Sequence, residues 1–278
     1  MKPYDCASIN THPQLNPMKG PTLPTDHQDR TSEAWRKLCA YIDALAASGD
    51  DEFTPREALG DALFAQIYTL PASIAQLKRV KKVGLYGSRL QWLPPEIGEM
   101  ESLEYFDPYT SYDLHWFPYE ITRCKHLKDS RISTRALFGN FKHRSPFPSL
   151  AGNPVRYHSQ NLKCSVCDTP ISYAQTDQYW ISLLIGTDVV PLLANVCSTS
   201  CKSRLPTPHE KYVQEPHKGG PDLQQPPDAE QEWVEIKKRL DRGEDVPGVI
   251  RIKAGEQKQG KKLGELPSLK LIRKIWEK

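Results

Sequence analysis

The 278-residue sequence lacks the features of several common protein classes. No apolar run approaches the ~20 residues that a membrane-spanning helix needs, and the N-terminus has no apolar stretch of the signal-peptide kind. The sequence also contains no Gly-rich phosphate loop, no nucleophile elbow and no His-Glu-x-x-His run. We therefore expect a cytoplasmic protein that is not an enzyme and does not act at a membrane.

A strong overall charge is also missing, because the formal net charge is only +3. The excess is local: residues 251–278 contain nine Lys or Arg against three Glu, so the rest of the chain is slightly acidic. A basic segment of this kind leaves nucleic-acid binding open as an alternative function. It does not make the whole chain a nucleic-acid-binding protein by composition.

Three copies of one short motif occur in the middle of the chain, at steps of 23 and 24 residues. They are Leu70-Pro71-Ala72-Ser73-Ile74, Leu93-Pro94-Pro95-Glu96-Ile97 and Phe117-Pro118-Tyr119-Glu120-Ile121. Further residues recur at matched offsets, with Val83, Phe106 and Ser130 thirteen residues after each start and Leu85, Pro108 and Ile132 fifteen after. This period is typical of leucine-rich repeats, in which each unit lays one short strand beside the last.

Residues 60–150 resemble the Leu-Pro-x-x-Ile class of leucine-rich repeat, found in Ras-suppressor-like proteins and in many short bacterial proteins. The resemblance implies a short solenoid with an open, curved face rather than a closed pocket. We expect Val83, Phe106 and Ile132 to lie on adjacent parallel strands. The sequence departs from the family at the bend, where Ser88, Ser111 and Arg135 replace its asparagine.

Side chains that flank the strand positions of such a repeat point onto its concave face. The resemblance selects three residues from each unit for that face: Lys82, Gly84 and Tyr86; Tyr105, Asp107 and Tyr109; Asp129, Arg131 and Ser133. Tyrosine contributes a large contact area with a polar tip, which is typical of protein interfaces. The candidate partner-binding residues are therefore Tyr86, Tyr105, Asp107, Tyr109 and Arg131. The alternative for Tyr105 and Tyr109 is that their rings fill the core.

Four of the seven cysteines form two close pairs, Cys164 with Cys167 and Cys197 with Cys201. Four thiolates at such spacing suit a structural Zn²⁺ site. The apolar runs 179–185 and 189–196, around Gly186-Thr187-Asp188, predict a hairpin between the pairs, and the second pair opens a short helix. This order resembles the treble-clef class of zinc modules. Two free thiol pairs or a redox dithiol remain alternatives. Cys6, Cys39 and Cys124 are read as structural or incidental.

The sequence thus predicts a mixed α/β protein with five segments. Residues 1–30 form a disordered or draped N-terminus, and 31–157 form a helical cap followed by the repeats. The cap comprises a helix that ends near Gly49 and a second helix opened by a capping box at Thr54. Residues 158–205 form the zinc module, and the proline-rich stretch 206–227 is a linker. Residues 228–278 contain a helix over 228–242, a short strand at 249–252 and a basic amphipathic helix at 266–276.

These features favour a non-catalytic interaction protein that binds and regulates or neutralises a protein partner, as an adaptor or immunity protein does. The alternative is a nucleic-acid-binding protein that uses the zinc module and the basic tail. An enzyme with an exposed zinc is the third class.

Overall fold

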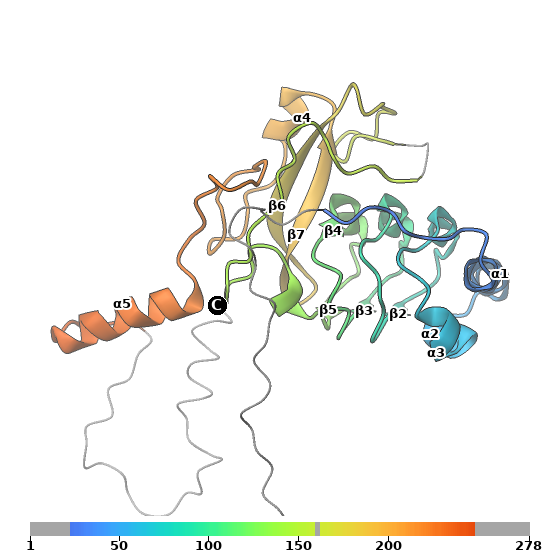
Figure 1. Ribbon diagram of the computed structural model, residues 1–278, viewed down its shortest axis with the longest axis horizontal. Helices are drawn as coiled ribbons and strands as arrows, with labels where there is room; N and C mark the ends of the chain where they lie inside the picture. Colours follow the sequence, from blue (N-terminus) through green and yellow to red (C-terminus); the bar gives the residue numbers. More distant parts are fainter. Residues whose placement is uncertain (1–22, 159–161, 248–278) are drawn as a thin grey trace, which may run out of the picture. The chain divides into compact units, whose positions relative to one another are not determined.

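The computed structural model describes residues 23–158 and 162–247 of the chain (Figure 1). They divide into two units at Pro226. The second unit contains α5 (Ala229–Asp241), which begins with a capping box formed by Asp228 and Gln231 and lies close to the helix expected over 228–242. Residues 1–22 of the expected N-terminal segment 1–30, the expected strand at 249–252 and the expected basic helix at 266–276 lie outside the described residues.

Among the described residues, one long and two short helices precede the repeats. In α1 (Glu33–Ser48) the Ser32 side chain accepts the backbone N–H of Trp35, and Gly49 ends the helix in the left-handed region at φ 72°. The second expected helix is instead two short ones, α2 (Pro55–Leu59) and α3 (Asp61–Phe64). The capping box expected at Thr54 does not form, because its side chain makes no cap hydrogen bond. Gly60, at φ 77°, separates the two helices.

The repeat region contains a parallel sheet of four strands in the order β1-β2-β3-β5 (Figure 1). The strands are β1 (Glu52–Phe53), β2 (Lys82–Gly84), β3 (Tyr105–Asp107) and β5 (Asp129–Ser130). Val83 pairs with Phe106, and Phe106 with Ser130, as their common offset from the motif implies. Ile132 does not lie on the third strand as expected, since β5 ends two residues before it. Strand β1, supplied by the segment between α1 and α2, was not predicted.

Three 3₁₀ helices form a second layer opposite the sheet: η1 (Ala72–Gln76), η2 (Pro95–Glu99) and η3 (Tyr119–Arg123). A fourth, η4 (Thr134–Ala136), follows β5 in the chain. The prolines of the motif, Pro71, Pro94 and Pro118, take extended dihedrals just before the first three helices. Leucine, isoleucine and phenylalanine side chains fill the space between the layers, and Val83, Phe106 and Phe117 are fully buried there. The buried hydroxyls of Ser88 and Ser111 hydrogen-bond each other at 2.7 Å at the bend.

The cysteine module forms a second sheet with the order β4-β7-β6. The predicted hairpin is confirmed as β6 (Asp177–Ile185) and β7 (Asp188–Val196), and α4 (Thr199–Ser203) follows it. Strand β4 (Phe117–Pro118) belongs to the third repeat motif and pairs in parallel with β7. Repeat region and module therefore share a sheet. A buried aromatic cluster supports this junction, with the rings of Trp116 and Trp180 edge to face at 5.7 Å.

The tip of the hairpin contacts the last strand of the repeat sheet. Thr187 donates its backbone N–H to Ser130 Oγ at 3.0 Å, and Ser130 Oγ donates to Asp188 Oδ2 at 2.9 Å. Gly186 leaves no room for a side chain, since a Cβ there would lie 2.7 Å from Ser130 Oγ. The hairpin thus covers the end of the parallel sheet beside β5.

The proline-rich stretch 206–227 packs on the hairpin rather than forming a contact-free linker. His217 exchanges two backbone hydrogen bonds with Trp180, and Tyr212 and His217 are buried.

Residues 23–30 are draped over the repeat region, where the buried Gln28 side chain accepts the backbone N–H of Tyr68 at 2.8 Å. In the described part of the chain, no helix has both the length and the apolarity to cross a membrane.

Candidate metal centre and interaction face

Two structural devices present the four cysteines. Cys164 and Cys167 lie on a turn in which Cys164 donates its backbone N–H to Thr169 and accepts that of Asp168. Asp168 adopts the left-handed region at φ 60°, which closes this turn. Cys197 directly follows β7, and Cys201 lies on α4, where Ser198 Oγ accepts its backbone N–H at 3.2 Å.

The four Sγ atoms lie within 4.8 Å of one another. The Cys167–Cys197 and Cys197–Cys201 Sγ pairs are each 3.6 Å apart. A tetrahedral site with metal–sulfur bonds near 2.3 Å requires sulfur–sulfur separations of about 3.8 Å. The four predicted ligands are thus brought together at a spacing that suits a metal ion.

The same proximity perturbs the thiols. Hydrogen bonds with Thr169 lower the pKa of Cys167 to about 6, whereas the hydrogen bond with Cys201 raises the pKa of Cys197 to about 12. One thiolate in the cluster therefore opposes ionisation of its neighbours. A bound cation reverses that effect and stabilises all four thiolates together.

Hydrogen bonds tie the metal centre to the third repeat unit. Arg123, at the end of η3, forms an ion pair with Asp168 at 2.6 Å and donates to the carbonyl oxygen of Ser165 at 3.2 Å. Ser165 Oγ in turn donates to Glu120 Oε1 at 2.7 Å and accepts the backbone N–H of Asn195 at 2.9 Å. The cysteine turn is thus held between η3 and β7.

The remaining described cysteines lie apart from this cluster. Cys124 is buried in the repeat core, and burial raises its pKa to about 12. Cys39 is half-buried on α1, where burial also raises its pKa. Cys6 lies outside the described residues.

The five candidate partner-binding residues form one contiguous surface, here called the tyrosine face. The Tyr86 and Tyr109 rings lie 6.2 Å apart, and the Arg131 guanidinium lies over both, at 5.6 and 4.5 Å. Asp107 accepts hydrogen bonds from Tyr105 Oη and Arg131, at 3.3 and 3.4 Å. Tyr86 and Tyr109 are 44% and 39% exposed, whereas Tyr105 and Asp107 are only partly exposed.

Arg56 is a member of this surface that the sequence did not identify. It reaches from α2 to within 5.9 Å of the Tyr86 ring and forms an ion pair with Asp61 at 2.7 Å. It lies 30 residues before Tyr86 and outside the repeat pattern, so only the folded chain brings it to the face.

No protein-family model matches this chain, and a comparison with curated proteins finds no significant match.

Proposed function

We propose that this protein is a non-catalytic interaction protein that binds a protein partner through the tyrosine face. The observation that carries the proposal is the convergence of two exposed tyrosines and Arg131 on one surface. Tyrosine and arginine are the residue types most enriched at interface hot spots. The two tyrosine rings lose little side-chain entropy on binding, because Arg131 and each other's ring already restrict them.

The repeat period and the parallel register support a leucine-rich repeat scaffold beneath this face. In such a scaffold an open end exposes apolar core and must be covered. The helices α1 to α3 precede the first repeat, and the hairpin tip contacts β5 after the last. We infer that these two elements are the caps.

Zinc is the metal that the cysteine set favours, since four thiolates in a tetrahedral arrangement satisfy it without water. We assign it a structural role. Its binding energy would hold the cysteine turn and α4 in place and thereby support the hairpin that contacts β5.

The charges of the face favour a protein over a nucleic acid. Lys82 pairs with Glu52, Arg56 with Asp61, and Arg131 with Asp107. Proteins bind a phosphate backbone through cations that neutralise its charge. Basic residues that already form ion pairs with carboxylates contribute little to such binding. The alternative of nucleic-acid binding rests on the basic tail, 251–278, which lies outside the described residues.

Affinity capture from the native cell, followed by a binding titration with the captured protein, tests the proposal. The double variant Tyr86→Ala/Tyr109→Ala should weaken binding by about 2 kcal/mol or more if the pair is a hot spot. Tyr112→Ala is the matched control, since Tyr112 is 65% exposed and is not part of the ring pair of the face. Protein binding that is insensitive to the double variant would contradict the proposal. Binding that collapses in salt and on neutralising the tail would support the nucleic-acid alternative.

A further inference from the structure

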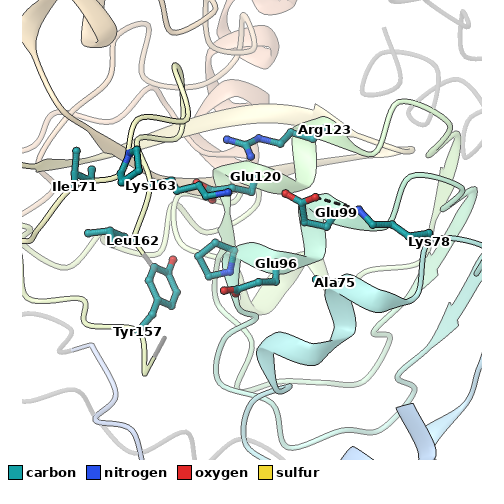
Figure 2. A pocket seen from close by; sticks show the side chains of 12 residues that line it. Ala75, Lys78, Glu96, Glu99, Glu120, Arg123, Tyr157, Leu162, Lys163 and Ile171 are labelled. Carbon is teal, nitrogen blue, oxygen red and sulfur yellow. Dashed lines mark hydrogen bonds and ion pairs between the residues drawn. The ribbon is translucent and has the colours of Figure 1, made fainter. Parts of the chain in front are cut away.

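A cleft of about 570 Å³ opens on the 3₁₀-helix layer, where η2 and η3 meet the segment that leads into the cysteine turn. Its volume is that of a small-molecule site. Figure 2 shows its lining side chains, which come from both sides: η2 and η3 contribute Glu96, Glu99, Glu120 and Arg123, and the other wall contributes Tyr157, Leu162 and Lys163.

Glu120 Oε2 and Tyr157 Oη are among the buried polar atoms of this cleft that have no hydrogen-bond partner. Glu120 is 5% exposed and Tyr157 9% exposed, so water scarcely reaches them. Burying such groups without partners is unfavourable, because they lose their hydrogen bonds to water. Glu120 uses its other oxygen to accept from Ser165 Oγ, which fixes its orientation. Both side chains line the cleft, so they offer a ligand two oxygen atoms without partners.

The cations around the cleft do not satisfy this carboxyl group. Lys78 is held by Glu99 and Glu101 at 3.1 and 2.9 Å, and Arg123 is held by Asp168. Lys163 is exposed at the rim. Burial raises the pKa of Glu120 to about 7, with Glu96 adding to the rise and Arg123 opposing it. A ligand cation would favour the ionised form.

We propose that this cleft binds an aliphatic primary ammonium group, with Glu120 Oε2 and Tyr157 Oη accepting its N–H bonds. The ammonium group has three donors and no acceptor, which matches two oxygen atoms that lack partners. Pro95, Leu162, Pro170 and Ile171 also line the cleft and provide apolar surface for methylene groups. A free alkylamine and the side chain of a lysine share this chemistry. The site is independent of the tyrosine face.

Titration of ¹⁵N-labelled full-length protein at pH 8, where Glu120 is mostly ionised, tests the assignment. The probes are n-butylamine, the neutral n-butanol and Nα-acetyl-lysine methylamide. We expect saturable amide shifts in residues 119–123 and 162–165 with butylamine and none with butanol. Tighter binding of the lysine derivative than of butylamine would identify a lysine side chain as the source, and the reverse order a free amine.

Glu120→Gln keeps the shape of the side chain and its acceptor for Ser165 but removes the charge, and should weaken butylamine binding at least about tenfold. Tyr157→Phe, which leaves the charge in place, should weaken it by a smaller factor. Glu99→Gln is the matched control, because the Glu99 carboxylate is engaged by Lys78 and should contribute little.

Three results would each overturn the proposal. They are equal responses to butylamine and butanol, no saturable shift up to 50-fold molar excess over millimolar protein, and equal losses of binding in Glu120→Gln and Glu99→Gln.

Discussion

The contact between the hairpin tip and β5 can be tested by adding one methyl group at Gly186. Its φ is +58°, and a Cβ there would lie 2.7 Å from Ser130 Oγ, 2.9 Å from Ser130 Cβ and 3.0 Å from the Asp129 carbonyl carbon. Gly186→Ala therefore combines backbone strain with a steric conflict. Left-handed backbone in a residue with a Cβ costs about 1–2 kcal/mol, and overpacking typically adds about 1–3 kcal/mol.

Gly152→Ala separates these two effects. Gly152 also has a positive φ, of 75°, but a Cβ there would meet no atom within 4 Å. The backbone strain and the lower entropy of the unfolded chain are then similar in both variants. We expect Gly186→Ala to lower the free energy of unfolding by about 1–3 kcal/mol more than Gly152→Ala.

Urea unfolding followed by tryptophan fluorescence measures this difference, since Trp116 and Trp180 are buried where the hairpin meets the repeats. Gly186→Ala should cost less in a Ser130→Gly background than in the unaltered protein, because Ser130→Gly removes two of the three conflicting atoms. Equal costs for the two alanine variants would refute the docking of the hairpin on β5.

Two further predictions concern buried residues of the repeat region. Phe106→Ala should lower the free energy of unfolding by about 3–5 kcal/mol in urea, since its ring is fully buried between the two layers; a loss below about 1 kcal/mol would argue against the register. The raised pKa of Glu120, about 7 against a usual 4.5, means that the folded protein holds a proton that the unfolded chain releases between these values. Stability should therefore fall as pH rises from 4.5 to 7, and Glu120→Gln should remove a loss on the order of 3 kcal/mol. Parallel stability–pH curves for the two proteins would contradict this.

Local patterns in the sequence were enough to predict several elements. The Gly49 stop and the β6–β7 hairpin each depend on residues close together in the chain, and both are present. The four cysteines also lie together as predicted. The hairpin between the two pairs reverses the chain once, and this brings the first pair next to the second. The mixed α/β class was predicted from the same local helix and strand patterns.

Other features depend on contacts between distant segments and were missed. Strand β1 is two residues long and is defined by its pairing with β2, so no periodicity marks it. The proline-rich stretch 206–227 has the composition of a linker, yet its backbone forms hydrogen bonds with Trp180 and Ser182 on β6 and with Phe147 and Leu150. Glu120 occupies a variable position of the repeat motif and becomes a buried carboxyl group only through packing against Ser165.

Metal analysis of the purified full-length protein tests the central claim most directly. We expect one equivalent of zinc per chain. The double variant Cys197→Ala/Cys201→Ala should lose it, because two sulfur ligands cannot form the closed site. Cys39→Ala, which removes a thiol outside the cluster, should retain it. Less than half an equivalent of metal in the unaltered protein, or full metal content in the double variant, would contradict the four-cysteine site.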